Sequence, residues 1–344
     1  MGIDVWDVDL NGWPSNGDDR DKLLFLLRFA ILAPSGHNTQ PWLFKVSENI
    51  LELFADRTRC LPVVDPEDRE LIMSCGCALY FFKLAAKRFG YCAEIEYFPE
   101  SSSQDLLARV RIVPSEPATN YELNMFSAIS ERHTNRQAYD ERGPSEEAID
   151  ELVSAVNDEG TWLQIVTGKD KRQAIAELIA EGDRIQASNK HFRRELSSWV
   201  HPNRSKQSDG MPGYAFGVGD IASNLGPFIL RTFDWGNGQA AKDHQLALGS
   251  PILAVLGSQL DTQESWLSTG QALAKLLLHI TAEGMSASFL NQPIETESLR
   301  NKVQEIICKD GYPQILLRIG YGPKAKPTPR REIENVLIID NLSR

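Results

Sequence analysis

The chain has 344 residues, which is room for about two domains at roughly 150 residues per domain. Hydrophobic residues make up 42% and charged residues 24%, so the chain can bury a sizeable core and is expected to fold. The 36 basic and 47 acidic residues leave a net charge of −11. This charge argues against nucleic acid or an anionic membrane as partner, because phosphate groups require a basic face.

The lack of a recognisable membrane span or secretory signal, together with the number and spacing of the cysteines, indicates a cytoplasmic protein. No uninterrupted apolar run approaches the ~20 residues that a membrane span needs, and residues 1–19 lack the basic start and apolar stretch of a secretory signal. The five cysteines are an odd number, and the gap between Cys75 and Cys77 fits neither a zinc knuckle nor a redox C-x-x-C motif. We therefore expect reduced, buried thiols and no metal site.

The predicted elements form two similar series in chain order. The first series is a helix, a strand, a helix that a glycine ends before an extended segment, and a buried strand, at 20–33, 41–46, 74–99 and 106–113. The second series repeats this order at 145–157, 161–166, 268–293 and 314–322. Pro144, Ser145 and the acidic residues that follow predict a helix start at the beginning of the second series.

An internal repeat relates these two series. When the chain is shifted by 194 residues, 74–99 aligns with 268–293 without a gap, and eight of the 26 positions are identical. Leucine and alanine matches are common between amphipathic helices, but matched glycines and a matched proline are not. Those matches are Gly76 with Gly270, Gly90 with Gly284, and Pro99 with Pro293. We interpret the chain as two copies of one unit.

The two copies differ in one polar loop and one insertion. Between its first helix and strand, the first copy has APSGHNTQ (33–40), whereas the second has only DEG (158–160). Residues 114–121 (PSEPATNY) contain two prolines and several small polar residues, a composition that suits a linker. Residues 185–246 have no counterpart in the first copy and are rich in glycine and aromatic residues. We expect this insertion to form a partly ordered cap rather than a third domain.

Two polar segments and a basic tail are candidates for chemistry. The loop 33–42 gathers short polar groups where a helix ends, although such groups also make ordinary hydrogen-bonded turns. In 131–140 every second side chain shares one face of an extended segment, so Arg132 and Arg136 flank Thr134. Two guanidinium groups around a hydroxyl suit a phosphate monoester, and a solvated polar edge is the alternative. The proline-rich tail 323–332 adds Lys324, Lys326, Arg330 and Arg331.

These segments together resemble the FMN-dependent nitroreductase family. APSGHNTQPWLF looks like that family's A-P-S-x-x-N-x-Q-P-W-x-F signature, and RHTNRQAYD resembles its R-x-S/T-x-R/K phosphate-binding start. AEGMSASFLNQP and PQILLRIGYG resemble its second half and closing strand. The two copies make the chain similar to the single-chain, Acg-like branch, in which both subunits of the usual homodimer are fused.

The resemblance implies an α+β, nitroreductase-like fold in which mixed sheets are flanked by helices and two pseudo-symmetric halves form an internal pseudo-dimer. The halves would be 1–118 and 119–344, with a lid at 185–246. It also implies one FMN per chain, held by residues from both halves. These cofactor-binding residues are Pro34, Ser35, Gly36, Asn38, Gln40, Arg132, His133, Thr134, Arg136, Glu283, Gly284, Met285, Arg330 and Arg331.

The implied activity is ping-pong hydride transfer through flavin N5, from NADH or NADPH to a nitroaromatic or quinone-like oxidant. In that scheme the isoalloxazine carries the chemistry, so no side chain is assigned a catalytic role, and His37 is expected to be structural. The chain would be a monomer or a loose homodimer. An FMN-sequestering protein with a closed lid and little turnover is the alternative, and dehalogenating or flavin-cleaving chemistry also stays open.

Overall fold

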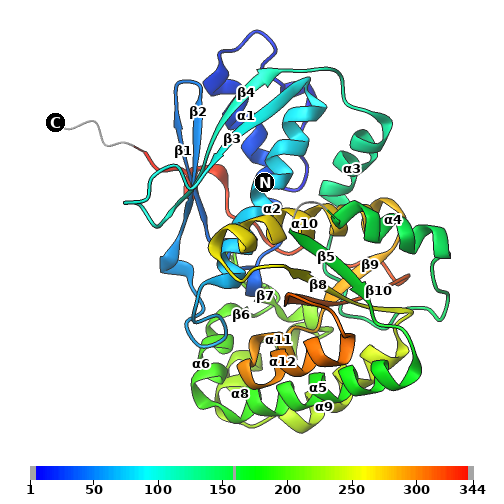
Figure 1. Cartoon of the computed structure of the whole chain (residues 1–344). Helices are drawn as coiled ribbons and strands as arrows, with labels where there is room; N and C mark the ends of the chain where they lie inside the picture. Colours follow the sequence, from blue (N-terminus) through cyan, green and yellow to red (C-terminus); the bar gives the residue numbers. More distant parts are fainter. Residues whose placement is uncertain (1–4, 158–159, 340–344) are drawn as a thin grey trace.

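Two four-stranded sheets organise the computed structural model, which describes residues 5–157 and 160–339 (Figure 1). The first series of elements builds one sheet with its helices, followed by α3. Its helices and strands are α1 (Asp19–Ala30), β1 (Trp42–Ser47), β2 (Ile50–Ala55), α2 (Arg69–Arg88), β3 (Tyr91–Tyr97), β4 (Leu106–Pro114) and α3 (Asn120–Glu131). Asp18 caps α1 by accepting a hydrogen bond from Asp21 N, and Thr119 with Glu122 forms a capping box on α3.

The second series builds the other sheet and carries the inserted elements. Ser145 caps its first helix, as predicted, by accepting from Ala148 N. The sheet and its associated helices are α4 (Glu146–Val156), β5 (Thr161–Ile165), β8 (Ile252–Ser258), α10 (Gln263–Ala282), β9 (Ser286–Phe289), α11 (Gln292–Glu295), α12 (Glu297–Ile307) and β10 (Tyr312–Gly320). The elements between β5 and β8 are α5 (Lys169–Ser188), α6 (Lys190–Trp199), β6 (Val200–His201), β7 (Met211–Pro212), α7 (Asp220–Ser223), α8 (Gly226–Thr232) and α9 (Gly236–Gly249).

Strand order supports the internal repeat. The first sheet runs β1-β2-β4-β3 and the second runs β5-β8-β10-β9, so each copy places its first, second, fourth and third strands side by side. In both copies the long helix, α2 or α10, lies between the second and third strands of the chain order. The two halves are therefore the same unit, and we propose a boundary between residues 118 and 119.

The insertion is longer than the sequence predicts. It begins directly after β5, because α5 has no counterpart in the first half, where a tight turn joins β1 to β2. Helices α5 and α9 pack with α11 and α12 on one face of the second sheet and enclose a small hydrophobic core. In Figure 1 these helices lie below the second sheet, and α6 and α8 lie beside them. Of the DEG segment in the second copy, Asp158 and Glu159 lie outside the described residues.

The matched glycines mark the point where α2 and α10 cross. A Cβ built on Gly76 would lie 2.3 Å from the carbonyl oxygen of Leu267, and one built on Gly270 would lie 2.0 Å from that of Met73. Both distances are far below van der Waals contact, so only glycine lets the two backbones approach this closely. One hydrophobic core continues through this crossing and draws residues from both halves. The halves are thus interlocked and not independent domains.

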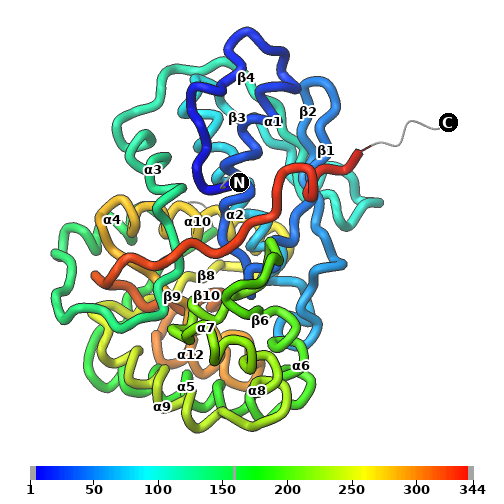
Figure 2. The backbone as a smooth tube through the Cα atoms, turned by 180° about the vertical axis from the view of Figure 1, so that it is seen from behind, coloured from blue at the N-terminus to red at the C-terminus, as the bar shows by residue number. Residues whose placement is uncertain are grey.

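The C-terminal segment returns from the second half to the first sheet (Figure 2). Phe44 N donates to Val336 O over 2.8 Å, and Ile338 N donates to Phe44 O over 2.7 Å, which makes a parallel bridge at the edge of β1. The pairings within both four-stranded sheets are antiparallel. Among the described strands, parallel pairing occurs at this bridge and in the separate two-stranded pair of β6 and β7. None of the helices within residues 5–157 and 160–339 combines the length and apolar character of a membrane span.

Candidate functional site

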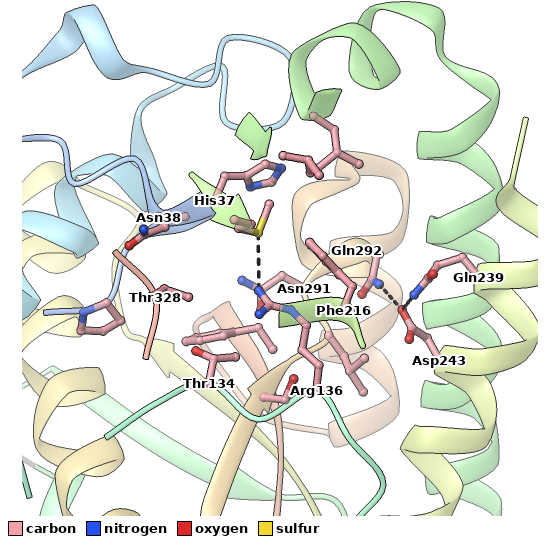
Figure 3. Close-up of a pocket in the computed structure, with 18 of the residues that line it drawn as sticks. His37, Asn38, Thr134, Arg136, Phe216, Gln239, Asp243, Asn291, Gln292 and Thr328 are labelled. Carbon is pink, nitrogen blue, oxygen red and sulfur yellow. Dashed lines mark hydrogen bonds between the residues drawn. The ribbon is translucent and has the colours of Figure 1, made fainter. Parts of the chain in front are cut away.

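A cavity of about 770 Å³ lies where the two halves meet the inserted elements. The loop 33–38 from the first half, the segment 132–136 and the C-terminal segment line one part of it. Helices α5 and α9 and the segment 288–292 line the other part. Figure 3 shows Asn38, Thr134 and Thr328 on one side, Arg136 near the middle, and Gln239, Asp243 and Gln292 on the far side. The volume of the cavity falls in the range of small-molecule sites.

The polar loop of the first half has a strained backbone. His37, Asn38 and Gln40 all have positive φ, at 49°, 56° and 52°, a region in which residues other than glycine are uncommon. Ser35 Oγ supports the turn by accepting from Gln40 N at 2.9 Å. Strain of this kind persists only where surrounding contacts hold it, and here those contacts come from the insertion and the C-terminal segment.

The loop clamps the insertion. Asn38 Nδ2 donates to Gly210 O at 2.9 Å, and Gln40 Nε2 donates to Ser208 O at 2.9 Å. Arg59, close to the loop, pairs with Asp209 and lies over a tryptophan ring of the insertion. We call residues 199–212 with these bonds the cap latch. Asn38 and Gln40 are both predicted to bind cofactor, but their side-chain amide groups donate hydrogen bonds to the cap latch.

Three buried arginines and the half-buried Arg136 line the cavity without acidic partners. Among the described residues, no carboxylate oxygen lies within 4.0 Å of their guanidinium groups, and all but Arg136 have a buried nitrogen with no hydrogen-bond partner. Burial lowers the pKa of two of them to about 10, and it also lowers the pKa of the other two. Uncompensated buried cations are costly, so the arrangement favours an anionic ligand. The four are Arg132, Arg136, Arg318 and Arg330.

The arginines that line the cavity differ in the groups that they contact. Arg330 donates to Asn38 Oδ1 at 2.8 Å and lies over the Trp6 ring, with its guanidinium carbon 4.6 Å from the ring centre. The side chain of Arg132 is 4% exposed, and repulsion from it adds to the burial that lowers the pKa of Arg330. Arg136 instead lies over the Phe216 ring of the insertion, 5.0 Å from its centre. Arg132 and Arg330 thus form one cationic pair, and Arg136 stands apart from it.

Nine predicted site residues line the cavity and five do not. Those that line it are Pro34, Ser35, Gly36, Asn38, Arg132, His133, Thr134, Arg136 and Arg330. Gln40 is fully buried and accepts from Arg331 N at 2.8 Å, while Arg331 lies 3.6 Å from Asp56. Glu283, Gly284 and Met285 close the end of α10, where Met285 N donates to Ile280 O. The repeat drew attention to this glycine, but the cavity wall is formed by residues 288–292 instead.

Sequence reasoning missed two further groups. Arg318 is 1% exposed in the middle of β10 and donates to Asn135 O and Gln137 O; a lone arginine within the apolar run ILLRIG is the signal that could have identified it. The second group comprises four carboxylates that also line the cavity. These are Glu70, Asp183, Asp243 and Glu295, which lie too far apart in the sequence to form a motif.

Two histidines at the cavity remain neutral. Burial lowers the pKa of His37 to about 4, and burial with the nearby cationic arginines lowers that of His133 to about 3. A histidine in an unfolded chain has a pKa near 6.5, so between about pH 6.5 and 4 the unfolded state binds more protons. Stability contributed by these residues is therefore lost as the pH falls through that window.

We expect the double variant His37→Gln and His133→Gln to lose less stability than the parent between about pH 7 and pH 5. Urea unfolding at both pH values measures this difference. Buried carboxyl groups with raised pKa values act in the opposite direction, but they are common to both proteins and cancel in the comparison. His191→Gln, at an exposed position, is the control and should behave as the parent. If the double variant lost as much unfolding free energy as the parent between these two pH values, the depressed pKa values of His37 and His133 would be contradicted.

Comparisons with known proteins identify the family. No protein-family model matches the chain. The chain is 32% identical over 326 residues to the Mycobacterium tuberculosis protein named "Putative NAD(P)H nitroreductase Rv3131", covering 93% of this chain and 92% of that protein. It is 28% identical over 323 residues to the protein of the same organism named "Putative NAD(P)H nitroreductase acg", covering 92% and 95%. The solved FMN and NADPH-dependent nitroreductase NfnB from "sphigopyxis sp. strain HMH" aligns at 18% identity and a TM-score of 0.43, covering 63% of this chain and 99% of that chain.

The relative at 32% identity spans nearly the whole of both chains. This chain therefore belongs to the NAD(P)H nitroreductase family.

Proposed function

We propose that the cavity binds one FMN per chain and that the protein uses it to oxidise NADH or NADPH and reduce a small oxidant such as a nitroaromatic or a quinone. The three buried arginines that lack carboxylate partners and keep unpartnered nitrogen atoms, Arg132, Arg318 and Arg330, are the observation that carries this proposal. A phosphate dianion on Arg132 and Arg330 would satisfy nitrogen atoms that have no partner and neutralise two buried charges. The Thr134 hydroxyl lies on the same stretch of wall.

The remaining wall suits a flat ring system. Pro34, Ser35 and Gly36 offer a short, mostly backbone surface, and the insertion supplies apolar side chains such as Phe216 and Trp235. Once bound, FMN would supply the hydride acceptor and donor. The chain would bind the phosphate, orient the ring against the polar loop and exclude water with the apolar cap. Arg136, held over the Phe216 ring, would link the phosphate-binding segment to that cap.

A single site per chain follows from the asymmetry of the repeat. The start of α1, next to where the mirror site would need its arginine pair, has the N-cap Asp18 and, in the first turn, Asp19 and Asp21 instead. Asp18 is engaged in capping α1. Carboxylates at this position would repel a phosphate, so we expect no second FMN at the mirror position.

Flavin content and reduction kinetics test the proposal. We expect purified or reconstituted protein to hold about one FMN per chain, and anaerobic mixing with NADH or NADPH to bleach the flavin absorbance in a stopped-flow instrument. Addition of a nitroaromatic or a quinone should then restore the absorbance. A colourless protein that does not take up FMN would rule out every flavin-based function for this cavity.

The cap latch supports a second candidate function, the storage of FMN without turnover. Asn38, Gln40 and Arg59 hold residues 208–210, next to Met211, which lines the cavity. A store predicts flavin that is bound but not bleached by either nicotinamide. The variant Asp209→Ala breaks the Arg59 pair and should then allow bleaching and faster FMN release, whereas Asp150→Ala on exposed α4 should not. Rapid bleaching of the parent protein would reject storage.

A further inference from the structure

Opposite the arginine pair, three helices bring together a polar cluster that the proposed flavin site does not use. Gln292 Nε2, from α11, donates to Asp183 Oδ1 of α5 at 3.0 Å and to Asp243 Oδ2 of α9 at 2.9 Å. Gln239 Nε2 also donates to Asp243 Oδ2, at 2.9 Å. Figure 3 shows Gln239 and Gln292 converging on Asp243. We call Asp183, Asp243 and Gln292 the acidic cluster.

The acidic cluster has more hydrogen-bond acceptors than donors. Asp183 is 2% exposed and Asp243 is 6% exposed, and both line the cavity. Asp183 Oδ2 and Gln292 Oε1 are buried without any hydrogen-bond partner. Within the described part of the chain, no basic nitrogen lies within 4.0 Å of either carboxylate. Buried carboxylates are normally paired, so this wall is incomplete without a cationic donor.

We propose that the substrate of this site carries a protonated amine, which the acidic cluster receives at the end of the cavity away from Arg132 and Arg330. This inference rests on the proposed function, because it identifies the class of molecule that the flavin site would act on. An ammonium group has three N–H donors and one positive charge. It therefore satisfies both orphan acceptors and compensates the buried carboxylate charge, which a neutral ligand does not.

In the absence of such a ligand the cluster holds protons. Burial and the neighbouring Asp243 raise the pKa of Asp183 to about 8, and burial also raises the pKa of Asp243. An amine that requires the ionised carboxylates should therefore bind more tightly as the pH rises toward about 8.5, with release of protons. The other charged groups that act on these two carboxyls are Arg136, Arg184, Lys242, Glu295 and Arg318.

The experiment compares benzylamine with its neutral isostere benzyl alcohol by calorimetric titration at about pH 8.5. Neither probe needs to be turned over, and both are titrated into protein with and without FMN. We expect benzylamine to bind at least about tenfold more tightly, as one to two charge-assisted hydrogen bonds would give. In Asp183→Asn with Asp243→Asn the two probes should bind equally, while Glu177→Gln, on the exposed side of α5, should keep the preference.

Equal binding of the two probes by the parent protein, or a preference that survives the double variant, would overturn the inference. The first result would mean that protonated carboxyls or water satisfy the cluster. Asparagine has the shape of aspartate, and thermal unfolding with flavin content reports whether the double variant folds; the single variant Asp183→Asn provides a second measurement. A parent protein that binds FMN but shows no preference for benzylamine contradicts only this inference, whereas a parent protein that cannot bind FMN contradicts the proposed function.

Discussion

Replacement of Arg132 by methionine is expected to weaken FMN binding roughly 10²-fold to 10⁴-fold, because a bidentate pair of charge-assisted bonds contributes about 3–6 kcal/mol. The same change should stabilise the FMN-free protein by about 1–3 kcal/mol, because it removes a buried, unpaired charge and keeps the side-chain volume. Arg132 is 4% exposed and its Nε has no partner. Flavin titration followed by fluorescence and urea unfolding of the FMN-free protein measure the two effects.

The opposite signs of these effects separate a ligand-binding arginine from a structural one. A structural arginine would destabilise the FMN-free protein when replaced. Arg20→Met, at an exposed position on α1, serves as control and should change neither quantity appreciably. Unchanged FMN affinity in Arg132→Met would remove this residue from the proposed phosphate site.

The variant Gly270→Ala is expected to lose about 3 kcal/mol or more of unfolding free energy, at the upper end of what overpacking costs. Its Cβ would lie 2.0 Å from Met73 O, a backbone atom of the other long helix, so the two helices must separate. Because the crossing holds the common core of both halves together, separation of the helices should also distort the cavity between the halves and weaken FMN binding. Urea unfolding and FMN affinity measure both consequences.

A matched control and a double-mutant cycle make this result specific. Gly249→Ala, at an exposed position at the end of α9 with no atom within 4 Å of the added Cβ, should not destabilise the protein, because alanine favours helix over glycine. Gly76→Ala should resemble Gly270→Ala. Once the helices have separated, the second alanine should cost less than the first, so the two changes should be non-additive. A fully additive double variant would show that the glycines do not share one contact.

Local sequence signals account for much of the fold and part of the site. Helical periodicity and the capping residue Ser145 located α4, and matched glycines identified the repeat. That Gly76 and Gly270 lie where α2 and α10 cross is seen only in the structure. Alternation along 132–136 singled out Arg132, Thr134 and Arg136, which line the cavity together with His133; their role in phosphate binding stays a prediction. These features depend on residues close in the chain or on a repeated pattern, and such short-range information is present in a single sequence.

Other assignments depended on partners that a single sequence does not reveal. Asn38 and Gln40 have the amide groups expected of cofactor ligands, yet the insertion and the C-terminal segment use those groups. The segment near Gly284 has the matched glycine, but the turn of the chain after α10 brings residues 288–292 to the cavity. A polar side chain has the same chemistry wherever it lies, and packing decides which neighbour it meets.

By itself, the sequence determined the duplication, the elements of each half, the polar loop and the arginine segment. Only the tertiary structure decided how the chain's charges are arranged around the cavity. Arg132 meets Arg330 across nearly two hundred residues of sequence, and Asp183 meets Asp243 and Gln292 through three separate helices. Burial makes these groups matter, because unpaired charges are costly only away from water, and burial arises when distant segments pack together.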